Sequence, residues 1–400
     1  MARIFQDGFE TLHTTTTSSS TLGQWDFSVD YITNKGSSWD CNMLTTAKNH
    51  ADTIAGLQVY SGIHNSTGTN AITLSSSFNS ATGELYGRIP FNVIDNQRGH
   101  YNSYFAGRGF IYLTSGGTEI VLIEFWNATS SGSMLQKIYV KSGGSWSLIA
   151  SGTNVPQAGT GWKWFEFYLK MGSTNGEFKT WWNDNGDIDV SSIDTTDSGT
   201  YSTINGMKIY TNGRGSSNGA NRTKLNWYFD DIAINSVTGS GQNEGRCGPY
   251  NYISILKPTG DKGAGYNDMD SSGSAYTKVD EFPPNANYSD AAELISSDIA
   301  GEKQAFTTTD TLSASATYIN CVAVRSSTKR DGLTEPTKLK GLYLPSAGGE
   351  AIGTTEDIST SAGETISFFG PHYNTGSGAV RFTKSELDNT ANAFGGESVT

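Results

Sequence analysis

The chain is poor in charged residues, and basic residues are the scarcer sign. Only 16% of its 400 residues are charged, and 27 Lys and Arg against 39 Asp and Glu give a formal net charge of −12. Scattered basic residues in a negative field make a poor surface for nucleic acid, so no nucleic-acid partner is expected. No run approaches the ~18 apolar residues of a transmembrane helix, so no membrane partner is expected either.

Cysteine and histidine are also scarce. The three cysteines lie far apart and form no C-x-x-C pair, which argues against both a disulfide framework and a zinc site; they are Cys41, Cys247 and Cys321. The five histidines show no ligand spacing; they are His13, His50, His64, His100 and His372. The polar start Met1–Gly8 is unlike a signal peptide, so folding in a cytosol is expected.

Aromatic residues and glycine are abundant. The chain has 9 Trp, 19 Tyr and 18 Phe, together 12%, and 47 Gly. One aromatic side chain buries about 150–250 Å². We therefore expect a core built largely from rings, within a turn-rich β-fold.

The distribution of tryptophan divides the chain. All nine Trp lie between Trp25 and Trp227, and none follows. The change coincides with a stretch rich in Gly, Ser and Asn over residues 238–249, which is typical of a linker. We predict a first domain over residues 1–237, a linker over 238–249 and a second domain over 250–400.

The first domain is expected to be β almost throughout. Short apolar runs alternate with turn residues, and no run of ten residues keeps a helical period. The best strands are Ile111–Leu113, Ile120–Trp126, Gln136–Lys141, Trp146–Ile149, Trp162–Leu169 and Phe178–Trp182.

Two turns and one strand of this domain allow finer predictions. The glycines of Ser142–Ser145 predict a hairpin, because glycine accepts positive φ. Asn183–Gly186 predicts a second hairpin after Phe178–Trp182. Trp162–Leu169 carries rings on both alternating sets, which predicts a strand in the middle of a curved sheet with cover on each face.

The second domain is also predicted to be mainly β. Its best strands are Tyr250–Leu256, Ala316–Val324, Leu339–Leu344 and Ile366–Phe369. One short helix is expected at Thr383–Leu387, where Thr383 and Glu386 have capping-box spacing.

Glu119 and Glu124 are the first candidate site. Jelly-roll glucanases place two Glu and an Asp along one strand, facing one cleft, and retaining hydrolysis needs two carboxyl groups about 5–5.5 Å apart. Here Val121 occupies the position of the assisting Asp. Alternation puts Glu124 on the opposite face from Glu119 unless a bulge intervenes. We therefore expect two carboxylates that lie on the solvent side or at a sheet edge.

Two acidic segments could bind calcium. Asn183–Asp189 has oxygen ligands at alternate positions, but its glycine is at the fourth position and no Glu is at the twelfth, so a plain turn is favoured. In Trp227–Asn235 the apolar face changes parity across Asp230 and Asp231, which predicts a bulge. These two carboxylates could accept backbone hydrogen bonds or, with Asp7 if the terminal strands pair, bind a structural Ca²⁺.

Other sites are disfavoured. Gly107 and Gly109 precede no helix, so a nucleotide site is not expected. Rings at strand spacing are mostly core, although Trp162 or Trp182 could present a sugar-binding face. We assign no catalytic, cofactor-binding or metal-ligating residue, and expect no cofactor.

Two sets of motifs resemble a family of virion proteins. Phe5–Glu10 and Tyr228–Asn235 resemble the two ends of a laminin-G/concanavalin-A-like jelly roll, in which the first and last strands are neighbours. A following string resembles one in tailed-bacteriophage virion proteins, where a β-domain follows a jelly roll. It consists of Gly248-Pro249, Leu256-Lys-Pro-Thr-Gly-Asp261, Tyr276-Thr-Lys-Val-Asp-Glu-Phe-Pro-Pro284, Asn287-Tyr288 and Arg381–Leu387.

The resemblance implies a non-enzymatic structural protein of the virion, in capsid, neck or tail. Its partners would be other virion proteins and copies of itself, and it would be made in the host cytoplasm. We expect the second domain to dock on the particle. The alternative is a glycan-binding module that recognises the host surface, and a jelly-roll glycoside hydrolase is the third hypothesis.

Overall fold

The structure is a computed structural model in which antiparallel β-strands dominate. It describes residues 2–7, 19–22, 25–30, 41–44, 56–61, 69–95, 108–127, 134–153, 161–214, 225–237, 246, 256–263, 265–269, 273–279, 295–309, 312, 322–328, 330, 336–346, 349–358, 363–368, 373–374, 379–380, 382 and 384–400. Within these ranges no helix is long and apolar enough to cross a membrane.

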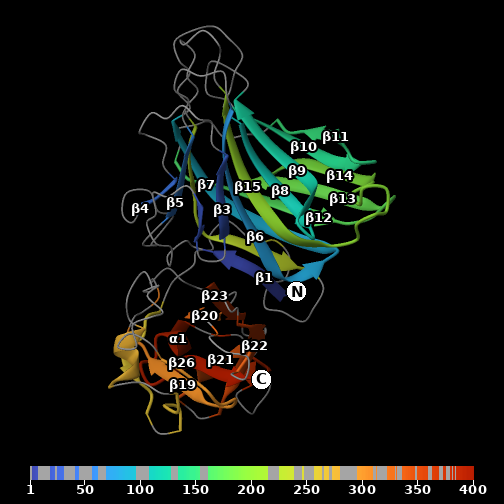
Figure 1. Ribbon diagram of the computed structural model, residues 1–400. Helices are drawn as coiled ribbons and strands as arrows, with labels where there is room; N and C mark the ends of the chain where they lie inside the picture. Colours follow the sequence, from blue (N-terminus) through green and yellow to red (C-terminus); the bar gives the residue numbers. More distant parts are fainter. Residues whose placement is uncertain are drawn as a thin grey trace.

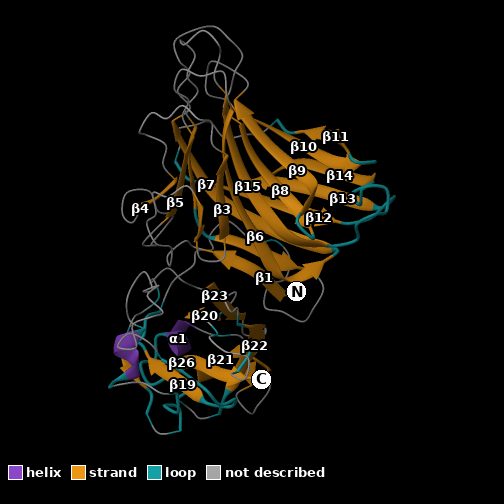
Figure 2. Cartoon of the chain, in the orientation of Figure 1, coloured by secondary structure: helices purple, strands orange, loops and turns teal. Residues whose placement is uncertain are grey.

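Two large antiparallel sheets form a jelly-roll β-sandwich from residues 2–236 (Figures 1 and 2). The nine-stranded sheet A runs β14-β13-β12-β7-β16-β5-β4, with β17 pairing both β7 and β1. Its strands are β1 (Ala2–Asp7), β4 (Cys41–Leu44), β5 (Gly56–Ser61), β7 (Glu84–Asp95), β12 (Lys163–Lys170), β13 (Gly176–Trp182), β14 (Asn185–Ile193), β16 (Leu225–Phe229) and β17 (Ile232–Ser236).

The eight-stranded sheet B lies against sheet A, in the order β11-β10-β9-β8-β15-β6-β3-β2. Its strands are β2 (Ser19–Leu22), β3 (Trp25–Asp30), β6 (Thr69–Thr82), β8 (Arg108–Ser115), β9 (Thr118–Asn127), β10 (Met134–Ser142), β11 (Ser145–Ser151) and β15 (Ile204–Arg214). The predicted strands of the first domain are thereby confirmed. The terminal strands β1 and β17 pair, as the resemblance implied.

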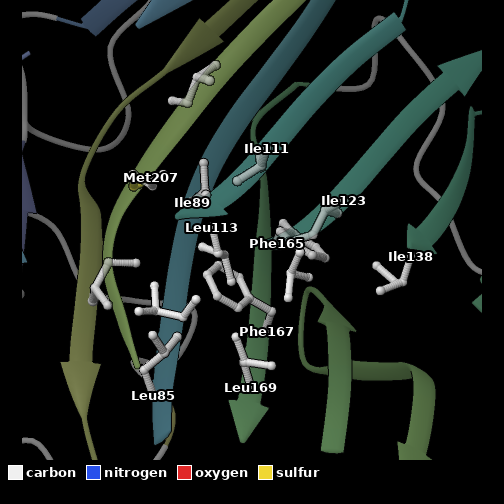
Figure 3. Packing of buried hydrophobic residues seen from close by; sticks show 14 of the residues in the cluster. Leu85, Ile89, Ile111, Leu113, Ile123, Ile138, Phe165, Phe167, Leu169 and Met207 are labelled. Atoms are coloured by element: carbon white, nitrogen blue, oxygen red, sulfur yellow. The ribbon is translucent and has the colours of Figure 1, made fainter. Parts of the chain in front are cut away.

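The core lies between the two sheets, and rings fill much of it. Sheet A contributes Phe165 and Phe167 from β12, while Leu113 and Ile123 of sheet B lie against them; all four are 0% exposed (Figure 3). The other face of β12 is buried too, since Glu166 and Tyr168 are 1% and 7% exposed. Strand β12 lies between β7 and β13 in the sheet, and both of its faces are buried, as predicted.

The two predicted hairpins form with two-residue turns. Gly143 and Gly144 join β10 to β11 with φ of 57° and 79°. Asn183 and Asp184 join β13 to β14 with φ of 46° and 71°. Positive φ at both positions is the geometry whose twist matches that of paired strands.

A smaller antiparallel sheet forms from residues 260–399, in the order β18-β19-β26-β21-β22. Its strands are β18 (Gly260–Asp261), β19 (Lys303–Thr307), β21 (Lys338–Leu344), β22 (Ala351–Asp357) and β26 (Ala393–Val399). Two-stranded pairs join β20 (Ala323–Thr328) to β23 (Gly363–Phe368), and β24 (Tyr373–Asn374) to β25 (Ala379–Val380). The predicted helix is α1 (Lys384–Leu387), and a 3-10 helix, η1, spans Ala275–Lys278.

The four strands predicted for the second domain have mixed outcomes. The predictions at Leu339–Leu344 and Ile366–Phe369 match β21 and β23, and β20 overlaps the end of Ala316–Val324. Residues 250–255 and 316–321 lie outside the described residues. Among the described strands, none of residues 260–399 pairs with one of residues 2–236. The domain limits themselves stay a prediction.

Asp261 links two parts of the motif string. Its carboxylate accepts hydrogen bonds from the backbone N–H groups of Ala275 (3.0 Å) and Tyr276 (2.8 Å), at the start of η1. A carboxylate at this place satisfies donors that a helix start leaves without partners. The Gly-Asp and Tyr-Thr-Lys parts of the string are therefore held together by one side chain.

Gly87 of β7 is required by the ring of Phe167. The two residues are directly opposite on β7 and β12, and a Cβ atom at Gly87 would lie 2.2 Å from Cζ of Phe167. We expect Gly87→Ala to lower the free energy of unfolding by about 1–3 kcal/mol, measured by urea denaturation, because the ring has to move within a packed core.

Gly186→Ala in β14 is the matched control for this prediction. There the nearest atom to a new Cβ, Cδ1 of Trp181, would be 3.7 Å away, an ordinary contact. Its unfolding free energy should change by less than about 0.5 kcal/mol. Equal effects of both substitutions would contradict the packing argument.

A row of charges crosses the smaller sheet. Lys303 of β19 lies opposite Glu397 of β26, which lies opposite Lys340 of β21. Lys303 Nζ also donates to both Glu350 oxygens, at 2.8 and 2.9 Å, and Tyr266 donates to Glu350 at 2.9 Å. The hydrogen bond from Lys303 lowers the pKa of Glu350, against the effect of burial.

This pKa shift predicts that acid weakens the smaller sheet. Because the pKa of Glu350 is lower in the folded chain, its contribution is present above the unfolded pKa of about 4.3 and is lost as the pH falls through the folded pKa. Unfolding by urea at pH 7 and pH 3 should show Glu350→Gln losing less stability on acidification than the parent chain, by roughly 0.5–1 kcal/mol. Asp357→Asn, at an exposed acid of β22, should behave like the parent.

Candidate functional site

Strand β9 brings Glu119 and Glu124 to the same face of sheet B. Its pairing with β8 shifts between Leu113↔Val121 and Thr114↔Glu119, so Ile120 is the extra residue of a β-bulge. Ile120 and Val121 are both fully buried in the core. Glu119 therefore lies with Glu124 on the face away from the core. The expectation that the two carboxylates face opposite ways is wrong, because a bulge intervenes.

The two carboxylates differ in their surroundings. Glu119 accepts a hydrogen bond from Lys208 Nζ of β15 at 3.1 Å, and its side chain is 36% exposed. Glu124 is 4% exposed. One carboxylate is thus in a half-exposed ion pair and the other is buried.

Tyr112 of β8 lies between these carboxylates. It is directly opposite Lys208 on one side and Leu122 of β9 on the other. Burial raises the pKa of the Tyr112 phenol, and the charges of Glu119 and Glu124 and the nearby Tyr210 raise it further. The hydroxyl therefore stays protonated at neutral pH, as a group that can both donate and accept a hydrogen bond.

Two more rings complete this surface. The ring of Tyr112 lies 5.9 Å from that of Trp146 and 6.3 Å from that of Tyr210, centroid to centroid. Trp146 comes from β11, three strands away from β8 in the sheet, and is 37% exposed. We call the set Tyr112, Trp146, Tyr210, Glu119, Glu124 and Lys208 the aromatic face.

Of the two rings named for a sugar-binding face, Trp182 is buried in the core. Trp182 is 2% exposed and packs edge-on against Phe125, with its Nε1 donating to Gln136 Oε1 at 3.0 Å. Trp162, directly before β12, is half-buried. The missed signal is alternation, since Tyr112 stands between the core residues Ile111 and Leu113.

The acidic residues of Asn183–Asp189 point to three different partners. Asp184 accepts a hydrogen bond from Arg246 at 2.6 Å, Asp187 accepts one from the Thr153 N–H at 2.8 Å, and Asp189 pairs with Lys179 at 3.3 Å. The oxygens thus do not converge on one point. Within the described residues, no group of three His, Cys, Asp or Glu could hold a metal ion.

Asp230 and Asp231 form the predicted bulge between β16 and β17. Strand β7 pairs Phe91 with Phe229 and Arg88 with Ala233, so β16–β17 has one residue more than β7 over this stretch. Asp231 has φ of 46°, and its N–H donates to the Asp230 carboxylate at 2.8 Å. Both aspartates are at most 1% exposed, and the backbone hydrogen bond agrees with their structural interpretation.

Arg246 ties the expected linker to sheet A. Its guanidinium donates to Glu166 (Nε–Oε2, 3.1 Å) and to Asp184, and lies 4.6 Å above the ring of Trp181. Glu166 is 1% exposed, so Arg246 compensates a buried charge. The histidines, Gly107, Cys247 and Cys321 lie outside the described residues.

Similar folds occur among solved structures, while no protein-family model and no curated protein matches the chain. The alginate lyase Aly36B is 17% identical, with 46% of this chain and 81% of that one covered and a TM-score of 0.32. The CBM2 module of the evolved Dit of Lactobacillus casei BL23 phage J-1 is 15% identical, with 58% and 96% covered and a TM-score of 0.35.

A β-1,3-1,4-glucanase (lichenase) derived from a mouse hindgut metagenome is 12% identical, with 59% and 99% covered and a TM-score of 0.35. This comparison contradicts the prediction that the chain is not an enzyme, because a lyase and a glucanase are among the similar structures. At such low identity the likeness concerns the fold and assigns no residue a role.

Proposed function

We propose that the first domain binds a glycan on the aromatic face. The observation that carries this proposal is the group of three rings, Tyr112, Trp146 and Tyr210, beside two carboxylates on the side of sheet B away from the core. Binding sites of this kind combine aromatic surface with a few polar groups that fix orientation. A sugar ring offers the matching apolar face and hydroxyl edge.

The polar groups of the aromatic face suit hydroxyl ligands. Carboxylates accept charge-assisted hydrogen bonds from hydroxyl groups, and Lys208 beside Glu119 supplies a donor. The neutral phenol of Tyr112 can do either. The carbohydrate-binding module among the similar structures is in keeping with this proposal, which rests on the rings themselves.

We further propose that the protein carries out this binding as part of a tailed-phage virion. The motif string of residues 248–288, which resembles one in virion proteins, supports this setting. In that setting the glycan belongs to the host surface, and the partners are other virion proteins and further copies of the chain. The second domain, residues 250–400, would dock on the particle. Binding confined to bacterial surface polysaccharides, among a panel that includes plant and algal glycans, would favour this setting.

Cleavage of the bound glycan is the second candidate, because the bulge at Ile120 places Glu119 and Glu124 on one face. Hydrolysis of glycosidic bonds uses two carboxyl groups with different roles. The two carboxylates differ in their surroundings, since Glu119 is half-exposed and paired with Lys208, whereas Glu124 is buried. Val121 is a core residue, so no assisting Asp stands between them.

Trp146→Ala should weaken glycan binding at least tenfold, which corresponds to about 1.4 kcal/mol, because it removes the most exposed ring of the face. Affinity is measured by calorimetry with the polysaccharide that the parent chain selects from the panel. Ile352→Ala, at an apolar residue 52% exposed in β22, should leave the affinity within twofold. No binding to any glycan at millimolar concentration would refute the proposal.

Hydrolysis is tested with the isosteric variants Glu119→Gln and Glu124→Gln. If the chain cleaves its glycan, we expect each variant to lose most of the reducing ends released, since each removes one of the two carboxyl groups. Both should keep the parent's binding to within about tenfold. Cleavage that persists in both variants would exclude this pair as its catalytic groups.

A further inference from the structure

The strand that carries Trp146 lies at an edge. In the sheet order β11 pairs with β10, and its other side ends sheet B. An edge strand has half the lateral hydrogen bonds of a central one. Trp146 nevertheless has to reach toward Tyr112 from three strands away. The place of β11 therefore depends on what holds its two ends.

Asp197 holds the beginning of β11. Its Oδ1 accepts a hydrogen bond from the N–H of Gly144, at 3.0 Å, in the turn that leads into β11. Gly144 comes two residues before Trp146, and Asp197 is 9% exposed. The two groups are 53 residues apart in sequence, so this bond joins the segment that follows β14 of sheet A to the turn before β11 of sheet B.

The segment around Asp197 is shaped to present it. Asp194 accepts hydrogen bonds from the N–H groups of Thr196 and Ser198, both at 2.8 Å. Asp197 and Ser198 have φ of 54° and 59°, a conformation that costs roughly 1–3 kcal/mol for a residue other than glycine. The backbone is thus strained at Asp197, whose carboxylate faces the turn between β10 and β11.

Asp187 holds the other end of β11. Its Oδ1 accepts a hydrogen bond from the N–H of Thr153 at 2.8 Å, two residues beyond the last residue of the strand. Between them Gly152 leaves room for this carboxylate, since a Cβ there would lie 1.9 Å from Asp187 Oδ2. Asp187 belongs to β14, the edge strand of sheet A.

We propose that Asp187 and Asp197 are positioning residues that hold β11 at its two ends and thereby set the place of Trp146 in the aromatic face. The consequence for glycan affinity rests on the proposed function. The position of the Trp146 ring does not, so the two can be tested separately.

The ring is followed by ¹⁹F NMR of the full chain labelled with 5-fluorotryptophan. Trp146→Phe removes one resonance of the nine and so assigns it. We expect Asp197→Ala and Asp187→Ala each to shift or broaden the Trp146 resonance while leaving the core resonance of Trp182 in place. Asp197→Asn and Asp187→Asn keep an Oδ1 acceptor and should restore the parent signal. Asp189→Ala, on β14 but 70% exposed and paired with Lys179, should change nothing.

Glycan affinity is measured on the same variants. We expect each alanine variant to bind about tenfold more weakly, with binding restored by asparagine. An unchanged Trp146 resonance in both alanine variants would overturn the inference, as would a lower melting temperature with no effect at Trp146. A resonance that moves in a chain whose parent binds no glycan would uphold the positioning role and refute the proposed function instead.

Discussion

One extra residue in strand β9 decides what the outer face of sheet B can do. Side chains of a strand alternate between its two faces, so a single insertion reverses the face of everything on one side of it. With Ile120 and Val121 both in the core, Glu119 leaves the core face and joins Glu124, Tyr112 and Lys208. Without the bulge, a carboxylate would enter a core of rings, where burying an unpaired charge is costly. Core packing and site geometry are thus two results of the same irregularity.

Central and edge strands of the sandwich differ in what their side chains do. Central strands such as β12 bury both faces, and their contacts leave little room for change, as the ring of Phe167 over Gly87 illustrates. Edge strands carry the exposed groups, Trp146 and Leu148 on β11 among them. Hydrogen bonds from both ends of β11 to Asp187 of β14 and to Asp197, in the segment after β14, fix a strand that pairs on one side with β10 alone.

Much of the fold could be predicted from the sequence because its signals are local. The two-glycine turn, the doubly apolar β12 and the change of parity at Asp230 and Asp231 each follow from residues adjacent in sequence. The aromatic face could not be predicted in the same way. Glu119 and Glu124 share a face because of a β-bulge at Ile120, and the run Glu-Ile-Val-Leu-Ile-Glu contains no residue that predicts a bulge. Tyr112, Trp146 and Tyr210 lie on three different strands far apart in sequence, so only the sheet order brings them together.

The hydrogen bonds from Asp261 to Ala275 and Tyr276 bear on how the motif string should be used. A side chain that joins two short sequence fragments constrains both of them, whatever the molecule does. This part of the string therefore describes a turn and a short 3-10 helix, and the proposed virion setting rests on the string as a whole. Contacts with a partner would instead be made by residues on the outer side of sheet B, which the string does not include.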